Sequence, residues 1–259
     1  MTLPTYSLTA TILVATLLFT AASCKKGDIG PAGPAGPAYT GNIAGFVSLF
    51  DQYGTKQLNN QSGIQVKEME TGKVATTDVN GKYEIDSLPT GNYTLQITDP
   101  SGNFAPSQVN QLQLIEGTVN HDVRLSARPN FALSTLSAVD TIVAGTAYIR
   151  LSGSLASTDT RARTLAIFVG SAPGTTSATS TYLLNVSKTV NANAITFVQY
   201  ILPADLNGAG LASGSTAYFA VYPAGATYAN ASSYEDLSNG RTVYNAIGAN
   251  AVTASALVP

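Results

Sequence analysis

Apolar and polar residues alternate in short runs along most of the chain. In residues 82–86 the odd positions are apolar and the even positions are charged, and residues 92–97 repeat the same two-residue period. This period is typical of a β-strand that buries one face. Residues 39–127 contain no stretch with the sustained period of a helix, so the pattern predicts an all-β protein.

The predicted strands fall into two groups on either side of Arg128-Pro129-Asn130, which we interpret as a short linker. Gly, Pro and Asn separate the runs in both groups, which favours two tandem Greek-key β-sandwiches covering residues 39–127 and 128–259. The strands predicted for the first sandwich are 43–50, 64–68, 73–78, 82–86, 92–97, 112–115 and 119–125. Those predicted for the second are 131–136, 147–155, 163–169, 182–190, 195–202, 217–222 and 242–247.

One short-range signal fixes a turn in the first group. Asn80-Gly81 lies between two strand-like runs. Both residue types tolerate positive φ, so this pair is typical of a tight hairpin. We therefore predict a hairpin turn with positive φ at Asn80-Gly81.

The first 24 residues show a different pattern. They contain no charged side chain, and residues 8–22 are almost entirely apolar. A helix that spans a membrane needs about 20 apolar residues, so this shorter run is more typical of a signal peptide. It ends in three small residues, 21–23, followed by Cys24, the only cysteine of the chain. An ordinary secretory signal, or a short membrane helix with an incidental cysteine, is the alternative.

The segment that ends at Cys24 resembles the lipobox of bacterial lipoproteins. The resemblance implies that residues 1–23 are removed by cleavage before Cys24. It also implies that Cys24 then carries acyl chains that hold the protein in a membrane. On this basis we expect a cell-envelope protein anchored to the outer membrane, on either its periplasmic or its surface face.

Residues 24–38 read as a tether between this anchor and the sandwiches. Four Gly-X-Y triplets begin at Gly27, Gly30, Gly33 and Gly36, which is a collagen-like repeat. Proline fixes φ, so the segment is stiff even as a single chain and would span about 37 Å. Collagen-like trimerisation is the alternative. Four triplets give few interchain hydrogen bonds, so we expect a stalk on a monomer.

Two stretches carry resemblances to known folds. Residues 77–85, TDVNGKYEI, followed by 88–95, LPTGNYTL, resemble the carboxypeptidase regulatory-like domain, a prealbumin-like sandwich of seven strands. Its motif is structural and implies no catalytic residue. Residues 211–221, LASGSTAYFAV, are similar to the end of a fibronectin type III domain, which implies a tyrosine corner built from Leu211 and Tyr218.

Two predicted strands of the second sandwich are apolar at both odd and even positions. They are residues 165–169 and 218–222. Such strands are either covered on both faces by other parts of the chain, or they present a second apolar face to a partner. We favour the first interpretation.

Composition narrows the range of chemistry. With one cysteine and one histidine, the chain has no internal disulfide and no metal site of the His/Cys type. Nucleophile–histidine pairs would depend on His121 alone, which we expect to be half-buried and hydrogen-bonded on a strand. A ligand or acid–base role for His121 is the alternative. No Gly-x-Ser-x-Gly, phosphate-loop or EF-hand pattern occurs. We therefore predict no enzyme, no cofactor and no metal. The net charge of −2 gives no basic surface for nucleic acid.

A long connection in the second sandwich is the predicted ligand site. Residues 224–241 exceed the length of an ordinary hairpin loop. They contain Tyr228, Tyr234, Glu235, Asp236 and Arg241. Tyrosine supplies flat contact area and a hydroxyl at low entropic cost, and its ring can stack on a sugar. The alternative is an insertion with no binding role.

Two further sites come from short patterns. Asp86-Ser87-Leu88 and Asp140-Thr141-Ile142 resemble the O-glycosylation sequon of Bacteroidetes proteins, which implies possible modification of Ser87 and Thr141.

Together these features predict a non-catalytic, lipid-anchored envelope protein that displays a binding or adhesion module on a stalk. Its partner would be a glycan or an envelope protein. The alternative is a structural spacer or an accessory subunit, for example beside a nutrient-uptake receptor, with no ligand of its own.

Overall fold

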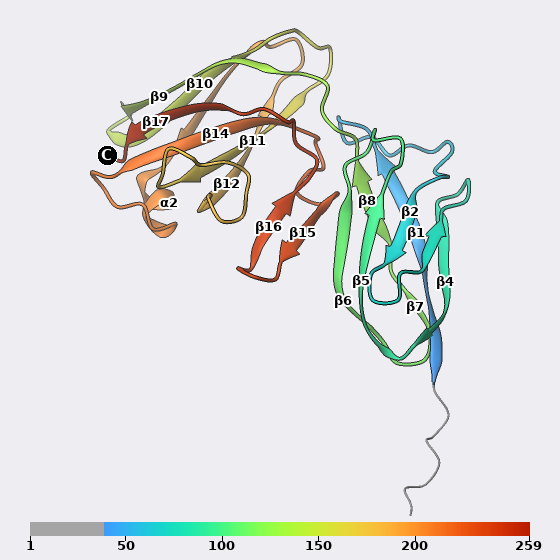
Figure 1. Cartoon of the computed structure of the whole chain (residues 1–259). Helices are drawn as coiled ribbons and strands as arrows, with labels where there is room; N and C mark the ends of the chain where they lie inside the picture. The colour runs from blue at the N-terminus through green and yellow to red at the C-terminus, as the bar shows by residue number, and fades with distance from the viewer. Residues whose placement is uncertain (1–38) are drawn as a thin grey trace, which may run out of the picture. The chain divides into compact units, whose positions relative to one another are not determined.

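A computed structural model describes residues 39–259 (Figure 1). The predicted signal peptide, Cys24 and the collagen-like stalk lie outside the described residues. In the described part, no helix is long and apolar enough to cross a membrane. Apart from the short helix α2 (Pro203–Gly208), the regular elements of this part are strands. All but one two-stranded hairpin belong to two sandwiches, so the predicted fold class is confirmed.

The first sandwich consists of two sheets. One has the order β4-β1-β7, with β8 also paired to β1, and the other has the order β3-β2-β5-β6. Their strands are β1 (Thr40–Phe50), β2 (Gln65–Glu68), β3 (Val74–Thr76), β4 (Lys82–Pro89), β5 (Gly91–Thr98), β6 (Ser107–Leu114), β7 (Gly117–Asn120) and β8 (Val123–Ser126).

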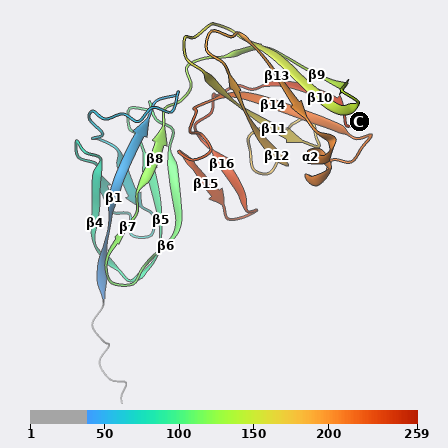
Figure 2. The same ribbon diagram turned by 180° about the vertical axis from the view of Figure 1, so that it is seen from behind.

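Strand β1 is central in its sheet, between β4 on one side and β7 and β8 on the other (Figure 2). β7 and β8 both run parallel to β1 and follow one another along it, so the sandwich has seven strand positions, as the resemblance implies. The interruption between them is fixed by contacts. The Phe46 N–H donates to Asp122 Oδ1 at 2.9 Å, and a Cβ on Gly45 would lie 2.0 Å from the His121 carbonyl oxygen.

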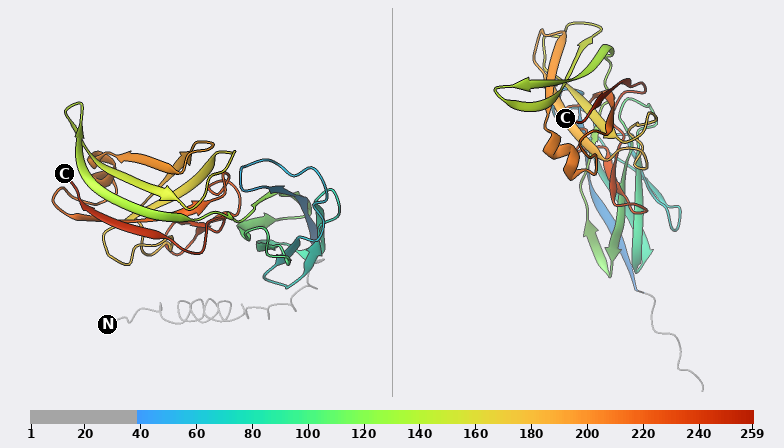
Figure 3. Two further views of the ribbon diagram at one scale, coloured as in Figure 1. Left: turned by 90° about the horizontal axis from the view of Figure 1, so that it is seen from above. Right: turned by 90° about the vertical axis from the view of Figure 1, so that its left-hand side faces the viewer.

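The second sandwich also consists of two sheets, ordered β13-β10-β9 and β12-β11-β14-β17. The first, second and fifth strands thus oppose the other four, which is a Greek-key arrangement of the fibronectin type III kind. Figure 3 shows β9 and β17 side by side at one edge. The strands are β9 (Leu133–Val143), β10 (Thr146–Leu155), β11 (Arg163–Gly170), β12 (Leu184–Val190), β13 (Thr196–Ile201), β14 (Thr216–Ala224) and β17 (Val252–Leu257).

Each sandwich encloses its own apolar core. In the first, the inward positions of β1, β4 and β5 meet, as their two-residue period predicts. In the second, the core includes Leu211, Ala217 and Phe219. Tyr218 points to the opposite side of β14, and its hydroxyl forms no hydrogen bond with another described residue. The predicted tyrosine corner is therefore not formed.

The last strand of the second sandwich differs from the prediction. Residues 242–247 are the last strand predicted for this sandwich, but β17 is the seventh strand of its two sheets. Most of the predicted segment belongs to β16 (Arg241–Tyr244), which pairs only with β15 (Ser233–Asp236). The physical reason is composition: β17 is made largely of small residues, so its strand period is weak in the sequence.

The turn at Asn80-Gly81 is only partly as predicted. Gly81 has φ of +83°, which confirms the positive φ there, but Asn80 is not among the residues with positive φ. The Asp78 carboxylate accepts the N–H groups of Asn80 and Lys82, both at 2.9 Å, and so organises the turn. β3 pairs with β2 and β4 pairs with β1. The turn therefore carries the chain between sheets, and the predicted hairpin is wrong.

Replacing Gly81 tests this close approach. In Gly81→Ala the new Cβ would lie 2.4 Å from the Val47 carbonyl oxygen. We expect the free energy of unfolding to fall by more than about 2 kcal/mol, because the clash adds to the cost of positive φ. Gly63→Ala is the matched control, since Gly63 has φ of +89° and nothing within 4 Å. It should cost only about 1 kcal/mol. Equal losses in urea melts would contradict the account.

Candidate functional site

The long connection between β14 and β17 folds back onto the second sandwich. We call residues 225–251 the insertion. Its tyrosines pack on the outer face of the sheet that contains β11 and β14. The ring of Phe168 lies 5.6 Å from that of Tyr222 and 5.7 Å from that of Tyr244, and Tyr244 lies 5.3 Å from Tyr228. The strands that are apolar on both faces are therefore covered by the chain itself, as we expected.

Two residues of the predicted ligand loop hold this cover in place. Tyr228 is only 2 % exposed, and its hydroxyl donates to Asn185 Oδ1 at 2.9 Å. Burial raises the pKa of Tyr228 to about 12. Arg241 donates to the carbonyl oxygens of Thr179, at 2.9 Å, and Tyr182. Tyr228 is too buried to contact a ligand, so its predicted role does not fit the structure. Arg241 is half-buried, and its role stays a prediction.

Asp236 also serves the insertion. Its carboxylate accepts the Ser238 N–H at 3.0 Å and the Thr179 hydroxyl at 2.7 Å. Hydrogen bonds from Ser238 and Thr179 lower the pKa of Asp236 to about 2. The carboxylate is therefore charged at neutral pH and fixes the turn between β15 and β16.

The remaining predicted residues, Tyr234 and Glu235, lie where the insertion meets the first sandwich. Figure 1 shows the hairpin of β15 and β16 beside β6. The side-chain amide of Asn110 donates to the Glu235 carbonyl oxygen at 2.8 Å. Gln108 donates to Asn110 Oδ1 at 2.6 Å, which fixes the orientation of both amides.

A groove of about 390 Å³ runs between β6 and this hairpin, and we call it the hairpin groove. Gln108 and Asn110 line it on one side, and Tyr234, Glu235 and Asp236 on the other. Neither of these β6 residues is among the site residues predicted from the sequence. Their alternation with Ser107 and Val109 could have placed them on an outer face, but not beside the insertion.

His121 lines a neighbouring cavity of about 330 Å³. His121 is half-buried, as predicted, but it lies between β7 and β8 rather than on a strand. Its ring forms no hydrogen bond with another described residue, so the predicted hydrogen bond is wrong. Arg124 and Asn230 lie in the same lining, and Gln108 is shared with the hairpin groove. Within residues 39–259, no cluster of three or more His, Cys, Asp or Glu side chains could hold a metal ion.

Ser232 joins the insertion to the first sandwich. Its hydroxyl accepts the Ser126 N–H at 3.0 Å and donates to the Ala105 carbonyl oxygen at 2.7 Å. Its own N–H donates to the Arg124 carbonyl oxygen, and its carbonyl oxygen accepts the Asn245 N–H. Ser232 is 1 % exposed and has φ of +56°, a strained conformation for serine. All of its polar groups are hydrogen-bonded.

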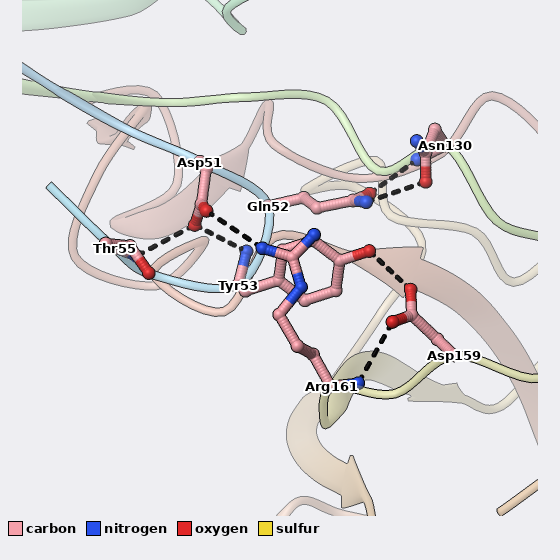
Figure 4. Close-up of polar contacts among 7 residues, drawn as sticks. All are labelled: Asp51, Gln52, Tyr53, Thr55, Asn130, Asp159 and Arg161. Carbon is pink, nitrogen blue, oxygen red and sulfur yellow. Dashed lines mark hydrogen bonds and ion pairs between the residues drawn. The ribbon is translucent and has the colours of Figure 1, made fainter. Parts of the chain in front are cut away.

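A second set of contacts joins the sandwiches at the loop after β1 (Figure 4). The Arg161 guanidinium lies 3.3 Å from the centroid of the Tyr53 ring and 3.5 Å from the Asp51 carboxylate. The Tyr53 hydroxyl donates to Asp159. Burial raises the pKa of Tyr53, and the hydrogen bond from Tyr53 lowers the pKa of Asp159.

The same loop holds the linker. Gln52 donates from its amide to Asn130 Oδ1 at 2.7 Å and accepts the Asn130 N–H at 2.8 Å (Figure 4). The Arg128 N–H donates to the Asn103 carbonyl oxygen at 3.1 Å. The predicted linker 128–130 is thus bound to the first sandwich rather than left as a free hinge.

The predicted modification sites differ in exposure. Ser87 is exposed, with φ of +55°, and its N–H donates to Asn42 Oδ1 at 3.0 Å. Thr141 is half-buried on β9 opposite Tyr148. Glycosylation of either residue stays a prediction.

Removing the Ser232 hydroxyl tests its role as a joint. Ser232→Ala leaves the buried Ser126 N–H and Ala105 carbonyl without their partner, so we expect a loss of about 2 kcal/mol in the free energy of unfolding. Ser233→Ala is the control, because the Ser233 hydroxyl donates to Ala229 on the exposed side of the insertion. It should cost about 0.5 kcal/mol or less. Equal effects in denaturant melts would contradict the proposed joint.

No protein-family model and no curated protein matches the sequence. Among solved structures, the chain is similar to a "putative carbohydrate binding protein" from Bacteroides uniformis, at 18 % identity and a TM-score of 0.29, over 84 % of this chain and 99 % of that one. It is also similar to a DUF3823 family protein from Parabacteroides merdae, at 17 % identity and a TM-score of 0.26, over 72 % and 92 % of the two chains.

A third similar structure is a type II cohesin–X-dockerin complex from Acetivibrio cellulolyticus, at 19 % identity and a TM-score of 0.28, over 34 % of this chain. The chain spans 58 % of the length of that structure and 62 % of another variant of the same complex. At these identities and TM-scores, none of the likenesses bears on the site, which rests on the residues of this chain.

Proposed function

We propose that the protein is a non-catalytic binding module, lipid-anchored in the cell envelope through Cys24, and that its ligand is a glycan held in the hairpin groove. The observation that carries the proposal is the pairing of fixed amides with an aromatic ring. Gln108 and Asn110 line one side of the groove, and Tyr234 lines the other.

This set of side chains suits a sugar. A side-chain amide offers both donors and an acceptor, so it can pair with hydroxyl groups in either sense. A tyrosine ring offers an apolar face for the C–H side of a pyranose, with a hydroxyl at its end. Glu235 adds a carboxylate acceptor at the exposed edge of the hairpin.

The groove is also preformed, because its two sides are joined by hydrogen bonds. One side comes from the first sandwich and the other from the insertion, and Ser232 and Asn110 bind the two together. A ligand that enters a preformed groove does not bear the entropic cost of ordering it. This supports binding through rigid complementarity.

The alternative is a structural spacer or accessory subunit that has no ligand of its own. The contacts around Tyr53 and Arg161 favour it, because a stiff two-sandwich body on a stalk would hold a partner at a set distance from the membrane. Under this alternative, glycans would not bind, and the fold would be unaffected by changes in the hairpin groove.

The glycan proposal is tested with immobilised polysaccharides followed by calorimetry on the captured ligand. We expect the double change Gln108→Ala and Tyr234→Leu to weaken binding at least tenfold, about 1.4 kcal/mol, with little change in melting temperature. Tyr200→Leu is the control, since Tyr200 is 45 % exposed on β13 and outside this groove. If the wild-type chain captures no glycan, or if the double variant binds equally well, the proposal fails.

The anchor is tested separately by metabolic labelling with palmitate. The wild-type chain should incorporate label and partition into membranes, because two or three acyl chains anchor a protein stably. Cys24→Ala should do neither. Cys24→Ser, which keeps the size of the side chain, is the matched control and should also stay unlabelled. Label in either variant would show that the lipid is elsewhere.

A further inference from the structure

A second groove, of about 510 Å³, lies on the first sandwich alone. It is lined by Glu70, Asn92, Tyr93, Thr94, Gln111 and Gln113, all from the sheet of β2, β5 and β6 or the turn that follows β2. We propose that this groove, the bulge groove, is a second glycan site and that it takes a neutral oligosaccharide. None of its residues belongs to the hairpin groove or to the predicted ligand loop.

The backbone at Gln111 is the first reason. The pairing of β5 with β6 shifts register between Tyr93 and Leu95, so Thr94 faces both Asn110 and Gln111. Gln111 occupies this bulge with φ of +56°. Glycine would adopt that conformation without strain, and asparagine tolerates it better than glutamine does. Bulges and strained residues of this kind concentrate at binding sites, where they re-aim a side chain.

The bulge separates two neighbouring amides. Asn110 faces the hairpin groove, whereas Gln111, the next residue, lines the bulge groove. In a regular strand, Gln111 would alternate with Asn110 and turn toward the core side of the sheet. The bulge instead places Gln111 in the same lining as Gln113 and Asn92.

Hydrogen bonds fix the positions of two residues of the groove, Glu70 and Tyr93. The Glu70 carboxylate accepts the Thr94 N–H with both oxygens, at 2.9 and 3.1 Å. The Tyr93 ring is 4 % exposed, and its hydroxyl donates to the Pro89 carbonyl oxygen at 2.5 Å. These contacts hold Glu70 and Tyr93 still before any ligand arrives.

The amide side chains along the exposed part of the groove have no hydrogen-bond partner among the described residues. The side chains of Asn92, Gln111 and Gln113 are exposed and form no hydrogen bond with another described residue. Each amide offers two donor hydrogens and an acceptor oxygen. Three such groups around one groove match the dense, mixed donors and acceptors of sugar hydroxyls.

The charge of the lining selects against other ligands. Glu70 is its only group that is charged at neutral pH, and no Lys or Arg side chain takes part. A phosphate or an acidic sugar would meet a carboxylate with no cation to offset it. One carboxylate is also too few for a calcium site, which takes six to eight oxygen ligands. A neutral oligosaccharide fits both conditions.

Calorimetry with cellohexaose, xylohexaose, mannohexaose and maltohexaose tests the proposal on the full chain in detergent. At least one of these probes should bind, and Gln111→Gly and Gln113→Ala should each weaken it at least tenfold. Gln111→Gly should keep or raise the melting temperature, since glycine relieves the positive φ. Tyr200→Leu, on β13 and outside both grooves, is the control and should leave this affinity unchanged. Gln108→Ala is measured beside it to report on the hairpin groove.

The outcomes separate the two grooves. Loss of affinity in the Gln111 and Gln113 variants, with no effect of Gln108→Ala, supports the bulge groove even if the hairpin groove binds nothing. An effect of Gln108→Ala alone supports the hairpin groove and overturns this proposal. Failure of every probe to bind the wild-type chain overturns it as well.

Discussion

The structure depends on how the backbone N–H and C=O groups at the open edges of the first sandwich are hydrogen-bonded. β6 and β8 each end a sheet and would expose unpaired backbone groups on the side that faces the insertion. Ser232 meets this need with its hydroxyl and its N–H, and the Asn245 side chain donates to the Pro106 carbonyl oxygen nearby. Because buried backbone groups must be paired, neither sandwich is complete at this junction without the other.

The insertion has a second task on its own sandwich. Phe168 and Tyr222 would otherwise present an apolar outer face, and the tyrosines of the insertion convert that face into a second core. The tyrosine hydroxyls of this core reach polar partners: Tyr228 of the insertion donates to Asn185, and Tyr182, which precedes β12, donates to the Thr242 carbonyl oxygen of the insertion. Tyrosine suits this place because it buries a ring and still pairs its polar end.

The sequence predicts the elements more fully than it predicts the site. The two-residue period locates the strands that contribute to the two cores, and apolar residues at both parities in β11 and β14 correctly indicate burial on both faces. The sequence does not show what covers them. Tyr228 and Tyr234 each follow a small hydroxyl residue in the same connection, yet one is buried and the other lines a groove. Only long-range packing decides between them, and the same holds for Gln108 and Asn110.

The parallel pairing of β1 with β7 and β8 has a consequence for the order of folding. The first strand of the sandwich occupies the centre of its sheet, but its neighbour on one side is made of residues 117–126. During synthesis, β1 therefore cannot complete its sheet until the whole of the first sandwich has emerged. Contacts between residues so far apart in the sequence form slowly, because the entropic cost of closing a long loop comes before the free energy gained from the contacts. Until then, one flank of β1 has unpaired backbone groups and can pair with a wrong strand.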